Sequence, residues 1–461
     1  MSAPPPLVPV HQAALALTLA VVLGCTQQAP SPSASLVEPI IGGNPVAEGA
    51  FPGVVWLDSG CTGVLVDEDT VLYAAHCGDQ ASEAWFGDKL TVEVDEANDT
   101  TRVVDADAHT HIPIDFCRLH PEPQLGQPTD IAYCRLKQPA MGRELLPTPL
   151  LGCERSALRV DQPVTMVGYG RDPVADTVGA KMVAETPLTW TITVLIAGNS
   201  EKGSCGGDSG GPLFVRTDSL NPDWAPRWRL AGILSSGAAG EACGSGRYVD
   251  VATALDWVEQ ETRRDLSPCG PADGSWNPSP RCRAAALDEN GAPLTEGATE
   301  FSDTCGAAFD ASKPDHTAPT IDAVTLEDLG VRAGEKHVNV LPAVSDVGWG
   351  VERVRIDFLD AAGETLETRI TELDPYGLED TVLPGKTKTV RVTATDYAGE
   401  SSSRDEPVRL GVTKAEASCA VSSPIGRRGE TAFITLAAGF AMAAALGADS
   451  SRRARRRRPL T

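Results

Sequence analysis

The sequence predicts an all-β fold in two separate regions, and two observations support this prediction. Residues 40–262 contain short apolar runs such as "GVVWL", "TVLYAA" and "LAGILS", which lie between turn-forming Gly, Pro and Asp residues. Residues 318–413 contain further strand-like segments at intervals of about ten residues, which is typical of an Ig-like β-sandwich. One segment, residues 251–266, has helical periodicity and places Ala254, Leu255 and Val258 on one face.

The composition indicates an acidic, disulfide-bonded protein. The 461 residues have a formal net charge of −24 and include twelve cysteines. An acidic protein lacks the basic face that nucleic-acid binding requires. No C-x-x-C pair occurs, so we interpret the cysteines as disulfides formed in an oxidising compartment. We therefore expect no nucleic-acid partner and no cofactor.

The N-terminus predicts export. The apolar run "AALALTLAVVLG" (13–24) has the length of a signal-peptide core, although the residues before it lack Lys and Arg. "VLGC" resembles the lipobox of bacterial lipoproteins, so residues 1–25 are predicted to be a signal peptide and Cys25 is a candidate lipidation site. An ordinary signal peptide is the alternative. Residues 26–39 are rich in Pro, Ser and Ala, which predicts a flexible spacer or propeptide.

The C-terminus predicts attachment to the cell envelope. The apolar stretch 431–448 is close to the shortest length that spans a membrane, and a cluster of arginines follows it at 452–458. Together with Cys419, a candidate processing site, residues 414–461 resemble the tripartite sorting tails of bacterial surface proteins (MYXO-CTERM type). A plain transmembrane anchor is the alternative. We expect an exported protein that is held at the cell surface or outer envelope, or is released from it.

Two further segments lie between the first β region and this tail. Residues 264–317 contain three cysteines and are predicted to be a linker or a small disulfide-stapled subdomain, and residues 267–317 are rich in Pro, Gly, Ser and Asp. In residues 318–413, "VSDVGWGVERVRI" and "VTATDYAGE" resemble bacterial Ig-like repeats at the level of pattern. The sequence leaves open whether this region binds cell-wall glycan, binds a protein substrate or does neither.

The stretch "KGSCGGDSGGP" (202–212) surrounds one serine, Ser209, with glycines. A nucleophilic serine needs a base that removes its proton and N–H groups that stabilise the resulting oxyanion. Glycines allow the chain to turn these N–H groups inward without a Cβ clash, so Gly207 and Ser209 are candidate oxyanion-hole donors. His76 in "LYAAHCG" is the candidate base, and Asp130 in "TDIAYCRL" is the candidate acid that orients it. The order His76, Asp130, Ser209 is that of the chymotrypsin triad.

These motifs resemble the trypsin/chymotrypsin-like serine proteases over residues 40–263. The resemblance rests on "IIGG", "AAHC", "DIAYCRL", "GYG", "GDSGGP" and "GRYVDV", which occur in the order and spacing of the family. It implies two six-stranded antiparallel β-barrels with a C-terminal helix and the triad in the cleft between the barrels. It also implies a serine endopeptidase that cleaves a protein or peptide substrate through an acyl-enzyme. Ser235 matches the family serine that supports the triad aspartate.

The resemblance further implies an activation step. In the family, a new N-terminal isoleucine inserts and pairs with the aspartate before the nucleophile, which here are Ile40 and Asp208. The bond to be cut follows Pro39, which makes a trypsin-like activator unsuitable. We hypothesise a zymogen that another protease trims. The alternative is that Asp208 has a different partner.

The substrate pocket implied by the resemblance comprises Gly203, Ser204, Ser236, Gly237 and Gly246. Gly203 stands where members that cleave after Lys or Arg have an aspartate, so we do not expect that specificity. An open, uncharged pocket favours a large apolar P1 residue, because its burial contributes to binding. An acidic P1 residue is the alternative if Lys202 or Arg247 points inward. Ser236 replaces a tryptophan that is common in the family, which predicts weaker contacts with an extended substrate.

The cysteines raise two further expectations. The resemblance pairs Cys61 with Cys77 and Cys205 with Cys243. For the remaining six, the sequence suggests the following pairs without determining their connectivity: Cys117–Cys134, Cys153–Cys269 and Cys282–Cys305.

We expect no metal site. The histidines 109, 111 and 120 lie in a polar loop without ligand spacing, and the acidic run "DEANDT" (95–100) is interpreted as a solvated loop rather than a calcium site.

Two other functions remain possible from the sequence. One is a non-catalytic adhesin or binding protein on a protease scaffold, and the other is an esterase that uses the same triad. The intact triad argues against the scaffold, because inactive relatives commonly lose at least one member. The expected partners are a peptide or protein substrate, an activating protease, and a membrane or cell envelope contacted through the termini.

Overall fold

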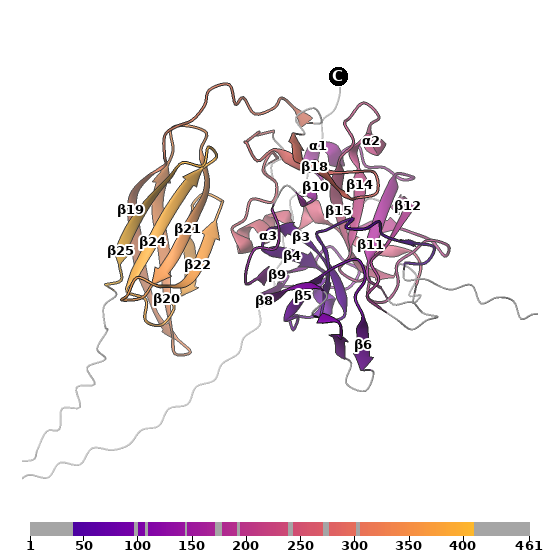
Figure 1. The fold of residues 1–461 in the computed structure, drawn as a ribbon, viewed down its shortest axis with the longest axis horizontal. Coiled ribbons are helices and arrows are strands. Elements are labelled where there is room, and N and C mark those ends of the chain that lie inside the picture. Colours follow the sequence, from indigo (N-terminus) through magenta and orange to yellow (C-terminus); the bar gives the residue numbers. More distant parts are fainter. Residues whose placement is uncertain are drawn as a thin grey trace, which may run out of the picture. The chain divides into compact units, whose positions relative to one another are not determined.

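The computed structural model describes residues 40–409 except 96–99, 107–108, 143–144, 171–177, 191–193, 238–242, 271–275 and 301–304. The predicted signal peptide, the spacer, the apolar stretch 431–448 and the sorting tail lie outside the described residues. Among the described residues, no helix has both the length and the apolar character that crossing a bilayer requires. The described chain is mostly β-structure (Figure 1).

The first barrel is closed by six antiparallel strands in the order β2–β3–β4–β9–β8–β5. Their bounds are β2 Val54–Leu57, β3 Cys61–Asp67, β4 Thr70–Tyr73, β5 Glu83–Phe86, β8 Thr110–Leu119 and β9 Ala132–Leu136. Strand β2 is apolar throughout because both of its faces are buried. Val55 and Leu57 pack inside the barrel, whereas Val54 and Trp56 pack in a cluster with residues of the second barrel. Strands β6 (Val92–Asp95) and β7 (Thr100–Val103) form a separate hairpin.

The second barrel is a ring of six strands. Pairing follows β12–β11–β14–β15–β16–β13, and β13 pairs again with β12. The bounds are β11 Pro163–Gly168, β12 Met182–Trp190, β13 Leu195–Ala197, β14 Pro212–Arg216, β15 Trp228–Gly237 and β16 Gly246–Asp250. The short strands β1 (Asn44–Pro45) and β10 (Thr148–Pro149) add to this sheet. The two six-stranded antiparallel barrels implied by the family resemblance are therefore present.

The helices are short. Among the described residues they are the 3₁₀ turns η1 (Ala75–Cys77) and η4 (Val251–Thr253) and the α-helices α1 (Gly152–Arg155), α2 (Thr217–Leu220) and α3 (Leu255–Thr262). The C-terminal helix is shorter than its periodicity predicted, because Arg263 adopts a left-handed φ of 58° and ends it. The predicted apolar face is correct, since Ala254, Leu255 and Val258 are all buried.

The cysteine-containing segment after α3 is more ordered than a plain linker. It contains a hairpin of β17 (Arg283–Leu287) and β18 (Pro293–Glu300), which packs on the barrels. The backbone N–H of Phe51 donates to the carbonyl of Gly291 over 2.8 Å, and Nε1 of Trp228 donates to the carbonyl of Asp288 over 2.8 Å.

Five disulfides are present among the described residues. They join Cys61–Cys77, Cys117–Cys134, Cys153–Cys305, Cys205–Cys243 and Cys269–Cys282. The suggested pairs Cys153–Cys269 and Cys282–Cys305 are wrong. All four of these cysteines meet in one small apolar cluster, so only their three-dimensional arrangement decides which sulfurs join.

The C-terminal β region is a sandwich of two antiparallel sheets around one core. One sheet contains β19 (Thr320–Arg332), β20 (Glu335–Ser345) and β23 (Leu378–Val382), in that order. The other has the order β22–β21–β24–β25, with bounds Thr365–Thr371, Val351–Leu359, Thr389–Asp396 and Ser401–Pro407. Alternate residues such as Val354, Ile356 and Phe358 face the core. The two-sheet arrangement agrees with the prediction, and its assignment as Ig-like stays a prediction.

Candidate active site

His76 and Asp130 are joined by two hydrogen bonds. His76 lies in η1 after β4, and Asp130 lies two residues before β9, the strand that pairs with β4. Nδ1 of His76 lies 2.8 Å from Oδ2 of Asp130, and the backbone N–H of His76 donates to Oδ1 over 2.8 Å. Because an ionised carboxylate only accepts, the ring proton is on Nδ1, and Nε2 is the nitrogen that can take a proton.

The carboxylate of Asp130 is buried but well supported. Its burial would raise its pKa, yet the hydrogen bonds from His76 and Ser235 outweigh this effect and lower the pKa below its usual value. The hydroxyl of Ser235 on β15 donates to Oδ2 of Asp130 over 2.5 Å and accepts the backbone N–H of Gly126 over 2.7 Å. Asp130 is therefore ionised at neutral pH and holds the imidazole in one orientation.

The loop of Ser209 packs directly against the loop of His76. Thr62 on β3 donates its backbone N–H to the carbonyl of Ser209 and its hydroxyl to the carbonyl of Gly207, each over 2.9 Å. A Cβ added at Gly210 would lie 2.2 Å from the carbonyl oxygen of Thr62 and 3.1 Å from the backbone nitrogen of Ala74, so only glycine fits there. Among the described residues, no hydrogen bond joins the hydroxyl of Ser209 to the imidazole of His76.

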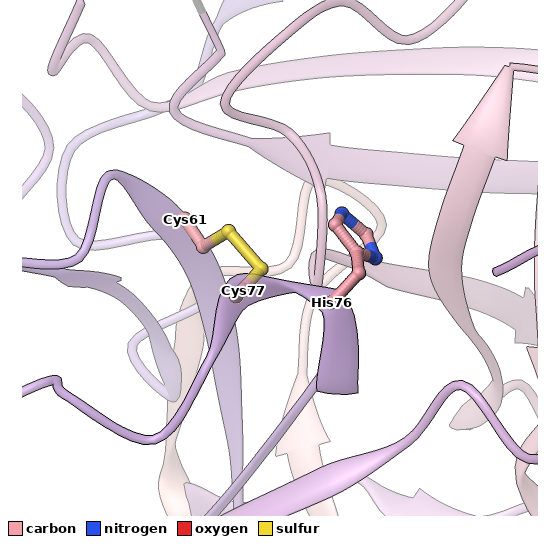
Figure 2. Close-up of side chains that lie close together, drawn as sticks. All are labelled: Cys61, His76 and Cys77. Atoms are coloured by element: carbon pink, nitrogen blue, oxygen red, sulfur yellow. A yellow bond between two sulfur atoms is a disulfide. The ribbon is translucent and has the colours of Figure 1, made fainter. Parts of the chain in front are cut away.

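A disulfide also joins strand β3, which contacts the Ser209 loop, to the segment that contains His76. Cys61, the neighbour of Thr62, is bonded to Cys77, the neighbour of His76, and Figure 2 shows the imidazole beside this bridge. The two sulfurs and the ring are close enough together to suggest a metal site. Sulfurs joined to each other are not thiolates, however, and thiolate is the form that binds metal. We therefore interpret this cluster as structural support for the His76 loop.

The two predicted oxyanion donors are available. Gly207 has a φ of 89° and Gly210 has a φ of 82°, and residues with a Cβ rarely adopt such backbone conformations. Within the described part of the chain, neither the N–H of Gly207 nor that of Ser209 donates to a protein acceptor. Two free N–H groups flanking a serine hydroxyl can stabilise a negatively charged oxygen.

Asp208 is buried behind the serine loop. Its carboxylate accepts the backbone N–H of Gly170 over 2.7 Å, that of Cys205 over 2.8 Å, and that of Ile40. Burial raises its pKa to about 7, although these hydrogen bonds act in the opposite direction. Ile40 is itself 1% exposed, so the structure brings the two predicted activation residues together.

The predicted pocket residues come from three neighbouring segments. Across β15 and β16, Ser236 pairs with Arg247 and Gly237 pairs with Gly246. A Cβ added at Gly246 would lie 2.8 Å from Oγ of Ser204.

Gly203 and Lys202 occupy the third segment. A Cβ added at Gly203 would lie 2.2 Å from the carbonyl oxygen of Gly244, so this position has no room for a side chain. Nζ of Lys202 donates to the carbonyl of Glu185 on β12 over 3.2 Å, so its charge is held at that strand.

Three residues that support the site were not predicted from the sequence. Thr62 on the first barrel donates hydrogen bonds to the serine loop of the second barrel. The one sequence signal for this role is that Thr62 directly follows Cys61, a member of the predicted Cys61–Cys77 pair. Gly168 and Gly170 belong to the recognised "GYG" motif, but the motif alone does not show their role. Added Cβ atoms there would lie 2.2 and 2.4 Å from oxygens of Asp208, so these glycines make room for its carboxylate.

Comparison with known proteins agrees with this geometry. Residues 40–258 match the Trypsin family. "Trypsin-like protease" of Streptomyces glaucescens is 29% identical over 233 residues, which are 46% of this chain and 79% of the relative. "Serine protease 7" of Drosophila melanogaster is 28% identical over 44% of this chain and 57% of the relative. "Chymotrypsin-C" of Mus musculus is 24% identical over 53% of this chain and 97% of the relative. Residues 40–258 of this chain therefore form a trypsin-like serine protease domain.

Proposed function

We propose that the chain is an exported serine endopeptidase. His76 acts as general base and then as general acid, Asp130 orients it, and Ser209 attacks the peptide carbonyl to form an acyl-enzyme. The observation that carries the proposal is the ionised, buried Asp130 bonded to His76, with the serine loop and its two free N–H groups held against the same loop. The disulfides support an extracellular location.

Labelling by a fluorophosphonate probe tests the nucleophile. We expect the full chain trimmed before Ile40 to be labelled once, the Ser209→Ala variant to be unlabelled, and the Ser156→Ala variant, which changes an exposed serine, to be labelled like the parent. A trimmed chain that is not labelled would support the scaffold alternative. A labelled chain that hydrolyses esters but no member of a peptide library would support the esterase.

For specificity, we propose that the preferred substrate has an apolar residue at P1 and an acidic residue further from the scissile bond. Lys202 is bonded to β12, which supports an uncharged pocket. Arg247 pairs with Ser236, at the strand position where the family commonly binds extended substrate, and its Nη1 lies 3.5 Å from an added Cβ at Gly126. No described residue forms an ion pair with this guanidinium.

A peptide library profiled with the parent, Arg247→Ala and Arg247→Lys tests this specificity. We expect the acidic preference to disappear in Arg247→Ala and to remain in part in Arg247→Lys. An acidic preference at P1 itself would favour the alternative pocket, and an unchanged profile would exclude Arg247 from substrate binding.

We also propose that the chain is a zymogen that is activated by cleavage before Ile40. The new ammonium would give Asp208 a cationic partner, which its buried carboxylate lacks in the uncut chain among the described residues. N-terminal sequencing and mass measurement of the mature protein would test this cleavage, lipidation of Cys25 and removal of the tail after Cys419 together. A full-length chain that is as active as the trimmed one would contradict the zymogen.

A further inference from the structure

Three aspartates from separate segments meet at one end of the β-sandwich. Asp315 precedes β19, Asp346 lies in the loop between β20 and β21, and Asp396 ends β24. One carboxylate oxygen from each lies within 4.8 Å of the corresponding oxygens of the other two. We propose that these three carboxylates bind a Ca²⁺ ion.

Backbone N–H groups hold each carboxylate in a defined orientation. Asp346 accepts with Oδ2 from the residues 348 and 350, and Asp396 accepts with Oδ1 from the residues 398 and 400, all within 2.9 Å. Asp315 accepts from the backbone of Thr317 over 3.0 Å and of Trp349 over 2.8 Å. For Asp346 and Asp396, these bonds use one oxygen only, and the second oxygen accepts no hydrogen bond from a described residue.

These second oxygens are buried without a partner. Asp396 is 0% exposed, and its Oδ2 accepts no hydrogen bond from any described residue. Oδ1 of Asp346 is equally covered and equally unpartnered within the described chain. None of the three aspartates forms an ion pair with a described Lys, Arg or His. A buried, unpaired carboxylate is costly, and a bound cation removes this cost.

The chemistry of the cluster favours Ca²⁺ over Mg²⁺. Ca²⁺ binds six to eight oxygen ligands in a flexible geometry at about 2.3–2.6 Å, so three carboxylates whose oxygens lie within 4.8 Å of one another can share it. Mg²⁺ requires a near-ideal octahedron at about 2.1 Å and usually keeps several waters beside one or two carboxylates, which fits a site of three carboxylates less well. The sequence did not predict this site, because its three ligands lie in distant segments that only strand pairing brings together.

The ion would fasten the chain that enters the sandwich. Asp315 belongs to that entering segment, and the neighbouring Lys313 accepts with its carbonyl from Nε1 of Trp349 over 2.7 Å. Phe309 also packs edge-on against the ring of Trp349. Binding of Ca²⁺ at Asp315, Asp346 and Asp396 would therefore connect this segment to both sheets and stabilise the sandwich. This inference does not depend on the proposed protease activity.

Calorimetric titration with CaCl₂ tests the site, with the full-length Ser209→Ala chain stripped by EDTA as the starting material. We expect one ion to bind with a Kd on the order of 10⁻⁴ M or tighter, and the unfolding temperature to rise with Ca²⁺. Asp346→Asn and Asp396→Asn should each weaken binding by at least about tenfold. Asp360→Asn is the matched control, because Asp360 accepts two backbone N–H groups in the β21–β22 turn and lies outside the cluster.

Several outcomes would overturn the proposal. They are the absence of Ca²⁺ binding by the parent, an equal response to MgCl₂, and full binding by Asp346→Asn with native circular dichroism. The last result would place the ion elsewhere, for instance at the acidic run 95–100. If Asp396→Asn does not fold, Asp346→Asn alone decides, since its exposed loop tolerates the change more readily.

Discussion

Two buried aspartates of the protease domain, Asp130 and Asp208, differ in pKa although they are almost equally buried. Asp130 is 0% exposed and Asp208 is 2% exposed. Asp130 accepts hydrogen bonds from an imidazole and a hydroxyl, and its pKa is lowered despite its burial. Asp208 accepts only from backbone N–H groups among the described residues, and burial raises its pKa to about 7. At both residues burial raises the pKa and the donated hydrogen bonds lower it, and only at Asp130, where the donors include an imidazole and a hydroxyl, do the hydrogen bonds prevail.

The difference in pKa means that the charge of Asp130 does not depend on cleavage of the chain, whereas the charge of Asp208 does if cleavage supplies a cationic partner. Asp130 carries its charge in every state of the folded chain, so it can always orient His76. Asp208 has a pKa of about 7 and therefore keeps its proton at mildly acidic pH, and cleavage before Ile40 would turn a backbone N–H that it accepts into a cationic ammonium group. Substitutions at Asp130, at Asp208 and at Thr62, which braces the serine loop, test this distinction, and we expect the greatest loss of activity at Asp130.

Asp130→Asn should reduce kcat of the trimmed chain by roughly 10⁴-fold, because the amide can donate to Nδ1 and so favours the wrong imidazole tautomer. KM and the unfolding temperature should change little. Steady-state kinetics with a peptide substrate and a thermal melt measure both. Asp79→Asn, an exposed change near the same loop, is the control, and a loss below about tenfold in Asp130→Asn would remove Asp130 from the triad.

The uncut Ser209→Ala chain should lose stability as the pH rises from about 4 to 7. In this window the folded chain keeps the proton of Asp208, whose pKa is about 7, while the unfolded chain with its pKa of 3.8 has released it. The free energy of unfolding should therefore fall by up to about 1.4 kcal/mol per pH unit through this group. Urea titrations across the window measure the slope.

The control variants isolate this slope. Glu259 also has a raised pKa of about 7, so only the difference from a matched variant is informative. Asp208→Asn should remove the contribution of Asp208 to the pH dependence of the free energy of unfolding. Trimming before Ile40 should remove it as well, since the new ammonium favours the charged carboxylate. Equal slopes in the uncut and trimmed chains would show that Ile40 does not pair with Asp208.

Thr62→Val should lower kcat/KM by about tenfold. It removes the hydroxyl that donates to the carbonyl of Gly207 and accepts the N–H of Tyr169 over 3.1 Å, and each lost bond to a buried group costs about 1–3 kcal/mol. Thr62→Ser keeps the hydroxyl and should keep most of the activity. Kinetics of the two trimmed variants, compared at equal fractions folded, measure the effect, and equal rates would show that the serine loop does not need this bond.

Much of the protease site could be predicted because its motifs specify local backbone. Gly207 and Gly210 take positive φ values as the glycine-rich run implied, and the stretches around His76 and Asp130 lie at the ends of two paired strands. The cysteine pairs beyond the family motifs could not be predicted in full, because Cys153, Cys269, Cys282 and Cys305 meet in one cluster and spacing alone does not choose among them.

By itself, the sequence determined the two β regions and predicted the candidate triad residues and their order, since apolar alternation and glycine placement act over a few residues. Only the tertiary structure decided which groups surround each buried carboxylate. The donors to Asp130, the backbone cradle of Asp208 and the unpartnered oxygens of Asp396 come from segments far apart in the chain. Charge depends on these neighbours because a low-dielectric interior strengthens each contact that water would otherwise weaken.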